Sequence, residues 1–460
     1  LVSEGVTLTI EPGVNVKFDN DKTIVIKGKL IAIGEKSSKI VFTSNLETPK
    51  KGDWGYIDIS NTSVDPTYDS NDNYIDGSTI QYADINFAGS KTGTGALTVT
   101  NSAIYINNVT ISKNLSHGIY LRKSVGGNVP ETKIYNSNFS ENENGIFCDC
   151  YQYNVALRVE SSNINNNSGD GISTGSGDGG GSHTFNYINN TINNNSGSGI
   201  IANSNGVQNI LGNIIYGNTN YGIRSRGHGP YNIKKNKIIN NNSVGLHGIY
   251  AVHNIENNIF YKNKGAIEIS QSGQYNISYN TIYDNDNSND GSAIDPYGGS
   301  SQSAWSTPIS VLSNTIVENT STSSAILTFQ PENGDPDFIL NYNNFINNIS
   351  DYDVKNYRSG SLKDINAENN YWGTVVESKI QERIYDWNRD GSKGYVDYNP
   401  FLNELDTLAP ISPPQNLSKL KSGNDVILSW SANLETDVSG YKLYYGNPTG
   451  YSYDTVIDLG

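Results

Sequence analysis

Apolar residues in the first 400 positions of the chain mostly stand between polar ones, and they return at a regular interval. The clearest repeating phrase is a small or polar residue, then an apolar residue, then an asparagine three positions later. The apolar residues of consecutive phrases lie 21 to 34 positions apart. They are Ile111, Phe139, Ile164, Ile192, Ile215, Ile239, Phe260, Ile282, Ile316 and Phe345.

A second phrase follows about eight positions later and places a glycine or alanine directly before an isoleucine. Apolar and polar residues alternate within it with a period of two, and no stretch keeps the 3.6-residue period of a helix, so the pattern predicts short strands. The phrase recurs as Gly118-Ile119, Gly145-Ile146, Gly171-Ile172, Gly199-Ile200, Gly222-Ile223, Gly248-Ile249, Ala266-Ile267 and Ala293-Ile294.

Short strands that repeat in this way predict a solenoid in which each coil stacks on the next. Parallel stacking at about 4.8 Å per coil would bury the apolar residues in columns. Asparagine side chains would form hydrogen bonds along the stack and satisfy the backbone of the turns.

The two ends of this region resemble a known superfamily. The opening Val6-Thr-Leu-Thr-Ile-Glu-Pro-Gly13-Val and the later Gly52-Asp-Trp-Gly55 look like the first coils of right-handed parallel β-helix proteins, and Asn369-Asn-Tyr-Trp-Gly373 resembles their last coil. The resemblance covers residues 1–403 and implies an all-β, right-handed parallel β-helix. The superfamily includes pectate lyases, hydrolases, epimerases, adhesins and tail spikes, so the resemblance implies no single function.

The remaining residues predict a different module. Residues 404–414 end in Pro410-Ile-Ser-Pro-Pro414, which is typical of a stiff linker. Residues 415–460 alternate like strands of a β-sandwich around Trp430 and resemble the first half of a fibronectin type III domain. We therefore expect a C-terminal β-sandwich fragment, with the chain stopping inside that domain.

The amino-acid composition limits the kinds of binding partner that the chain could have. The formal net charge is −15, which disfavours nucleic acid and anionic membrane surfaces, and no apolar run approaches the roughly 18–20 residues that span a bilayer. The two cysteines, in Cys148-Asp149-Cys150, form no disulfide framework and share an inward phase, so we expect buried thiols. A surface rich in Tyr, Asn, Ser and Gly suits an extracellular or cell-surface protein.

One loop has the spacing of a calcium site. If Asp386 is counted as position 1 of this loop, oxygen-bearing side chains stand at positions 1, 3, 5 and 12. Gly391 occupies position 6, where calcium loops make a sharp turn. The alternative is an Asx-rich turn that caps the last coil. The candidate metal ligands are Asp386, Asn388, Asp390, Ser392 and Asp397.

Outward residues beside the second phrase form a candidate binding face. Tyrosine rings there suit sugar rings, and arginines suit the carboxylates of an acidic glycan; alternatively, the column is simply the mixed surface of a tyrosine-rich solenoid. The candidate binding residues are Tyr120, Arg224, Arg226, Tyr250, Glu268, Asp295 and Tyr297.

Several of these residues are weak catalytic candidates. Glu268 and Asp295 fall on adjacent coils, where two close carboxyl groups can serve as acid and nucleophile in glycoside cleavage. The nearest candidate base for a lyase is Arg224 or Arg226, beside a calcium-bound uronate.

The sequence thus favours a secreted or cell-surface β-helix with an adhesive, glycan-binding or structural role over an enzyme. The alternative is a polysaccharide lyase or glycoside hydrolase acting on an acidic polysaccharide, and a third option is self-assembly through open sheet edges or association with neighbouring domains of a longer chain. Four longer segments would either roof a groove or decorate an edge: Pro66–Gly77, Gly177–Gly181, Asn287–Ser306 and Gln330–Asp337.

Overall fold

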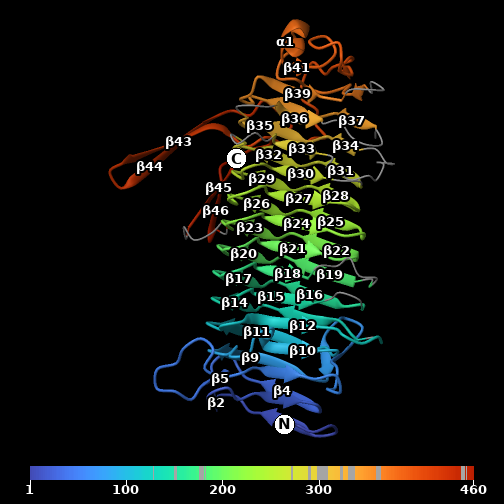
Figure 1. Ribbon diagram of the computed structural model, residues 1–460. Helices are drawn as coiled ribbons and strands as arrows, with labels where there is room; N and C mark the ends of the chain where they lie inside the picture. Colours follow the sequence, from blue (N-terminus) through green and yellow to red (C-terminus); the bar gives the residue numbers. More distant parts are fainter. Residues whose placement is uncertain are drawn as a thin grey trace. The chain divides into compact units, whose positions relative to one another are not determined.

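Parallel β-strands wound into successive coils make up most of the computed structural model (Figure 1). It divides into two compact units, Leu1–Asn254 and Ile255–Gly460. The expected all-β parallel β-solenoid is confirmed. The structure describes residues 1–127, 129–149, 153–175, 181, 183–270, 273–287, 292–297, 309–321, 325–329, 337–358, 364–446, 451 and 453–460.

Coils of the N-terminal unit contribute to two sheets, which we call the A face and the B face. The A face takes one strand from each coil: β3 (Ile24–Ile26), β6 (Ile57–Ile59), β10 (Gly95–Thr100), β12 (His117–Arg122), β15 (Ile146–Asp149), β18 (Ile172–Thr174), β21 (Ile200–Asn203), β24 (Ile223–Arg226) and β27 (Leu246–Ile249).

The B face takes two short strands or one long strand from each coil. Its strands are β1 (Thr7–Ile10), β2 (Asn15–Phe18), β4 (Lys29–Ile33), β5 (Ile40–Ser44), β9 (Thr79–Asn86), β11 (Tyr105–Ser112), β13 (Thr132–Tyr135), β14 (Asn138–Ser140), β16 (Ala156–Glu160), β17 (Asn163–Asn165), β19 (His183–Ile188), β20 (Thr191–Asn193), β22 (Gly206–Leu211), β23 (Ile214–Tyr216), β25 (Tyr231–Lys234) and β26 (Lys237–Ile239). A separate hairpin consists of β7 (Thr67–Tyr68) and β8 (Tyr74–Asp76), and β28 (Val252–Glu256) spans the boundary in the sequence.

The C-terminal unit repeats this arrangement with fewer coils. Its A-face strands are β30 (Ile267–Ser270), β33 (Ile294–Tyr297), β36 (Ala325–Phe329), β39 (Tyr352–Asn356) and β41 (Ile384–Tyr385). Its B-face strands are β29 (Ile259–Tyr261), β31 (Gln274–Ser278), β32 (Thr281–Tyr283), β34 (Ile309–Leu312), β35 (Thr315–Val317), β37 (Phe338–Asn341), β38 (Asn344–Ile346), β40 (Ile365–Asn366) and β42 (Val396–Asp397). The helix α1 (Glu377–Glu382) is the single helix of the described residues.

Asparagine side chains tie neighbouring coils together in two ladders. In the N-terminal unit the backbone N–H and side-chain Nδ2 of Asn195 both donate to Oδ1 of Asn218, at 3.1 and 3.0 Å, and Asn218 repeats this with Asn241. A second ladder, through Asn190 and Asn213, lies five residues earlier in each coil. These side chains are at most 2% exposed, so the asparagines of the first phrase are structural.

The ladders also correct the register of one predicted phrase. Ile215 pairs with Ile238, not with Ile239, because the asparagines two before and three after the apolar residue are Asn236 and Asn241. Ile238 is fully buried and fills the column.

The second phrase is also misassigned in one coil. Ile223 pairs with Leu246, which precedes the predicted Ile249 by three residues. Tyr250 and Ala251 follow the strand with φ angles of 61° and 59°, so they belong to the turn and not to the face.

Residues beyond the solenoid form small antiparallel sheets. β43 (Gln415–Ser422) pairs with β44 (Asp425–Ser431), and β45 (Lys442–Tyr445) pairs with β46 (Thr455–Asp458). Side chains such as Leu417 and Val426 are more than half exposed. These sheets suggest a β-sandwich without completing one.

The cysteine prediction is tested at one position. The side chain of Cys148 is buried, as expected, and Cys150 lies outside the described residues. No helix of the described part of the chain is long and apolar enough to cross a membrane.

Candidate functional site

The predicted A-face column holds together only in part. Arg224 lies opposite Ile201 and His247, and Arg226 lies opposite Asn203 and Ile249. The residue that continues the column beside Arg224 is therefore His247 and not Tyr250. Burial and the nearby Arg224 lower the pKa of His247 to about 4, so this ring is neutral at pH 7.

Tyr120 is held inside an aromatic stack. Its ring lies 5.6 Å from that of Phe147 with 4° between their planes, and its hydroxyl donates to Asp149 at 3.0 Å. The side chain is only 8% exposed, which leaves little of the ring for a ligand.

The two carboxylates of the C-terminal unit do meet. Glu268 in β30 pairs directly with Asp295 in β33, one coil spacing away. Burial and the charge of Glu268 raise the pKa of Asp295 to about 7, and burial raises the pKa of Glu268. Oδ1 of Asp295 is buried without a hydrogen-bond partner among the described residues. Tyr297 occupies β33 opposite Ser270, but its side chain lies outside the described part of the structure.

Hydrogen bonds between residues of the predicted calcium loop hold its turn in place. Asp386 accepts the backbone N–H of Asn388 at 3.0 Å through Oδ1 and that of Val396 at 3.1 Å through Oδ2. Asp390 accepts the backbone N–H and hydroxyl of Ser392. Across the described ranges, no three His, Cys, Asp or Glu side chains gather in a way that could hold a metal ion. Calcium binding at this loop stays a prediction.

A groove that the sequence analysis did not identify lies on the B face of the N-terminal unit. Its volume is about 570 Å³, within the roughly 300–1,000 Å³ of ordinary ligand sites. We call it the tyrosine groove and define it by its lining residues: Asn71, Asp72, Asn73, Tyr74, Gln81, Tyr105, Asn107, Tyr135, Asn136, Arg158 and Glu160.

Register between coils sets the floor of the groove. Asn107 of β11 pairs with Tyr135 of β13, and Tyr135 pairs with Glu160 of β16. The parallel column beside it places Tyr105 opposite Lys133, which pairs with Arg158. The alternating period of a strand turns these residues outward while intervening residues such as Ile106 and Ile134 fill the core.

Tyrosine rings line this floor. The ring of Tyr74 stacks on that of Tyr105, with centroids 5.1 Å apart, and Tyr105 lies 5.9 Å from Tyr135. Each ring is half-buried. Burial raises the pKa of Tyr74 and of Tyr135 to about 12, so both hydroxyls stay protonated at neutral pH.

The predicted extra segment Pro66–Gly77 is the β7–β8 hairpin, which forms one wall of the groove. Asp69 holds its loop by accepting the backbone N–H groups of Asn71 and Asn73 at 2.8 and 2.9 Å. The hairpin thus borders a groove through Asn71–Tyr74, and a roof over a groove stays a prediction. The segments Gly177–Gly181, Asn287–Ser306 and Gln330–Asp337 lie largely outside the described residues.

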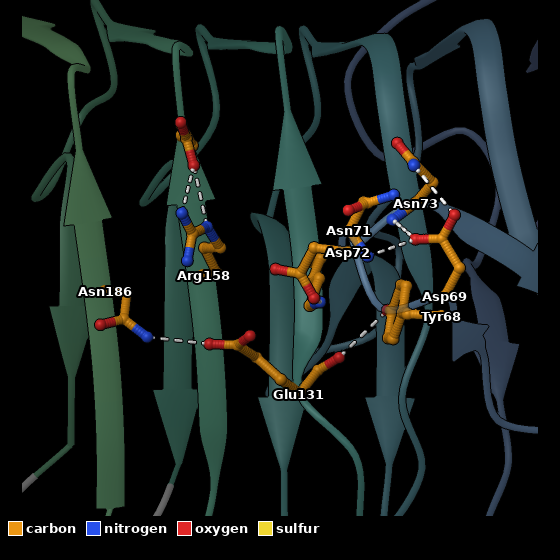
Figure 2. Close-up of polar contacts among 10 residues, drawn as sticks. Tyr68, Asp69, Asn71, Asp72, Asn73, Glu131, Arg158 and Asn186 are labelled. Atoms are coloured by element: carbon orange, nitrogen blue, oxygen red, sulfur yellow. Dashed lines mark hydrogen bonds and ion pairs between the residues drawn. The ribbon is translucent and has the colours of Figure 1, made fainter.

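Contacts between the hairpin and the coils fix this wall. The hydroxyl of Tyr68 donates to the backbone oxygen of Glu131 at 3.3 Å, and Nδ2 of Asn186 donates to the Glu131 carboxylate at 2.9 Å. Figure 2 shows Glu131 between these two partners. Lys133 lies over the Tyr68 ring, 3.7 Å from its centroid, and forms an ion pair with Asp72.

The groove is not predicted by the second phrase, because that phrase marks only the strands of the A face. The signal was present: Tyr105, Lys133 and Arg158 fall at equivalent positions of successive coils, and a long insertion precedes them. Their meeting with Tyr74 depends on how the hairpin folds back, which no periodicity encodes.

Comparisons with known proteins assign no family to the chain. No protein-family model and no curated protein matches the chain. Its structure is similar to that of a periplasmic alginate epimerase (14% identity, 65% of this chain and 73% of that chain covered, TM-score 0.34) and of a mannuronan C-5 epimerase A-module from Azotobacter vinelandii (15%, 75% and 87%, 0.33). A similarity to the Dettilon tailspike protein has 13% identity, covers 74% of this chain and 62% of that chain, and gives a TM-score of 0.35.

Proposed function

We propose that this chain is a secreted or cell-surface β-helix protein that binds a polysaccharide in the tyrosine groove. The observation that carries the proposal is the row of half-buried rings of Tyr74, Tyr105 and Tyr135 along an open groove. Aromatic faces bury the apolar faces of sugar rings, and neighbouring amides and carboxylates exchange hydrogen bonds with hydroxyl groups. The role is adhesion or retention on a glycan rather than catalysis.

The amino-acid composition and residues 415–460 both support the proposed secreted or cell-surface location. An acidic surface rich in Tyr, Asn, Ser and Gly suits the exterior of a cell. The antiparallel pairs in residues 415–460 support a partial fibronectin type III-like domain, a spacer common in long surface proteins. A separate cooperative transition in the thermal unfolding of the chain, removed by Trp430→Ala, would support the domain assignment, and its absence would contradict it.

Affinity electrophoresis through gels that contain a panel of neutral and acidic polysaccharides tests the binding function. The wild-type chain is expected to be retarded by at least one polysaccharide, and Tyr135→Ala should weaken that retention about tenfold, the loss of roughly 1.4 kcal/mol. Tyr444→Ala, which removes a half-exposed ring of the tail, is the matched control and should leave it unchanged. Equal retention of both variants would contradict the site.

Cleavage is the second candidate function, because the Glu268–Asp295 pair is a specific observation in its favour. One strand spacing, about 4.8 Å, approaches the separation of roughly 5–5.5 Å in retaining glycosidases. New reducing or unsaturated ends on acidic polysaccharides, lost in Glu268→Gln or Arg224→Ala, would establish a glycoside hydrolase or lyase. Polysaccharides that remain uncleaved after long incubation with the protein, with and without calcium, would exclude both enzyme activities.

Calcium at the Asp386–Asp397 loop is a separate proposal. Asp390 and Asp386 would exchange some of their turn hydrogen bonds for the cation. A rise in unfolding temperature on adding Ca²⁺, reversed by chelation and lost in Asp390→Asn, would support it. Superimposable unfolding curves would contradict it.

A further inference from the structure

Resting on the proposed polysaccharide site, we propose that the tyrosine groove selects uncharged hexose chains over uronate chains. The arginines of the A face predict an acidic glycan. The charges around the groove itself argue for the opposite selectivity.

Both cations at the groove are already neutralised by its own carboxylates. The Arg158 guanidinium donates through Nε to Oε2 of Glu160 at 2.8 Å, and its Nη2 lies 2.8 Å from the same oxygen. Lys133 is paired with Asp72 and only 5% exposed. A uronate carboxylate would therefore have to displace a built-in carboxylate before it found a positive partner.

Further negative charge surrounds these pairs. Asp69 lies in the hairpin loop, and Glu131 lies beside the floor, where its carboxylate accepts a hydrogen bond from the amide of Asn186 and also acts on the charge of Arg158. The groove itself is lined by two carboxylates, Asp72 and Glu160, and by one cation, Arg158, so its lining carries an excess of negative charge. Each uronate added to a bound chain would bring a like charge within a few ångströms, where repulsion between groups near a protein surface costs energy.

The same groups suit neutral hydroxyl groups. Carboxylates accept hydrogen bonds from hydroxyls without needing a counter-charge, and the amides of Asn73, Asn107 and Asn136 offer both donors and acceptors beside the rings. Asp72 is held as an acceptor by Lys133, which is fixed in turn over the Tyr68 ring. A hexose can therefore stack on tyrosine while its hydroxyls meet acceptors that are already positioned.

The test compares two polymers with the same sugar backbone: polygalacturonate, which carries a carboxylate on each residue, and its fully methyl-esterified form, which carries an uncharged methyl ester there. The full chain is expected to retain the esterified polymer at least tenfold more tightly, with an affinity that changes little between low and high salt. Glu160→Gln releases Arg158 and should raise affinity for polygalacturonate several-fold while weakening the esterified form. Glu141→Gln, an exposed charge change outside the groove, is the control.

The outcomes separate the two proposals. Tighter binding of polygalacturonate, lost in Tyr135→Ala, would overturn the neutral selectivity and keep the polysaccharide site. Retention that Tyr135→Ala leaves intact, or no retention by any polymer of a wider neutral and acidic panel, would overturn the site itself. A Glu160→Gln variant with unchanged selectivity would show that the Arg158–Glu160 pair does not set it.

Discussion

At the residue scale, buried asparagines hold neighbouring coils of the solenoid together through their hydrogen bonds. Oδ1 of Asn218 accepts two hydrogen bonds from Asn195, while its Nδ2 donates to Asn241 and to the backbone oxygen of Ile192. A buried amide is tolerable only when its donors and acceptors are paired in this way. Asparagine also tolerates the left-handed turn conformation, which Asn194 and Asn240 adopt.

Replacing one ladder residue should be costly. Asn241→Ala removes the acceptor of two buried donors of Asn218, and an unpaired buried donor costs about 1–3 kcal/mol. Chemical denaturation should show a loss of about 2 kcal/mol or more in the unfolding free energy of that unit. Its neighbour Asn242 is exposed, so Asn242→Ala should stay within about 0.5 kcal/mol. Equal effects of the two substitutions would refute the structural role of the ladder.

The raised pKa of Asp295 predicts a pH dependence. Its folded pKa, about 7, lies above the value of about 3.9 expected in the unfolded chain, so the folded state binds the proton more tightly. The resulting stabilisation is present below about pH 4 and is lost as the pH rises through 7. Asp295→Asn mimics the protonated form and lacks this dependence.

Thermal unfolding of the two proteins between about pH 4 and pH 8 provides the measurement. The unfolding temperature of the wild-type chain should fall relative to that of Asp295→Asn as the pH rises. Comparing the pair cancels the opposite contribution of buried histidines such as His253, whose pKa is lowered by burial to about 3. A constant difference across the range would contradict the raised pKa.

At the element scale, the glycine of the second phrase has a steric cause. A Cβ atom on Gly199 would lie 2.7 Å from the backbone oxygen of Gly222 in the next coil and 2.6 Å from a methyl carbon of Ile215. Equivalent approaches occur at Gly118, Gly145, Gly171 and Gly222. The glycine therefore allows the backbones of two neighbouring coils to approach closely at the residue directly before the buried isoleucine.

Gly199→Ala should consequently destabilise the N-terminal unit by about 1–3 kcal/mol, the usual cost of forcing an atom into a packed region. Gly126→Ala is a suitable comparison, because a Cβ atom there meets nothing closer than Tyr153 at 3.7 Å. Urea midpoints of the two variants give the result. A tolerated Gly199→Ala would mean that the coils separate more easily than their packing indicates.

The strands and turns of the repeating coils could be predicted from the sequence, but the tyrosine groove could not. The buried columns and the asparagine ladders follow from a spacing that the sequence displays directly. Errors arose where two apolar residues adjoin, as at Ile238 and Ile239, and where a strand starts early, as at Leu246. The tyrosine groove depends on the folding-back of the β7–β8 hairpin, which lies outside the repeat.

At the scale of the whole molecule, the predicted linker 404–414 is not free in the C-terminal unit. Leu405 packs with Val317 and Ile346. Asn344 donates to the backbone oxygen of Asp406 at 3.0 Å and accepts its N–H at 2.8 Å. The segment is therefore fastened along β35 and β38 before the tail begins.

This attachment predicts protection from proteolysis. Leu405 is 9% exposed, so Leu405→Ser should loosen the segment and speed its cleavage by a nonspecific protease several-fold. Leu408→Ser, at a side chain that is 71% exposed, should leave the rate nearly unchanged. Mass spectrometry of the fragments locates the cuts, and similar rates for both variants would argue against the attachment.

The central claim is that the tyrosine groove is where a polysaccharide binds. Hydroxyl-radical footprinting of the full chain, with and without a polysaccharide that retards it, tests this most directly because it reports on each tyrosine separately. We predict protection of Tyr74, Tyr105 and Tyr135, with Tyr444 and Tyr453 of the tail unchanged. Protection confined to the tail or to the A face, with the three groove tyrosines oxidised as before, would contradict the account.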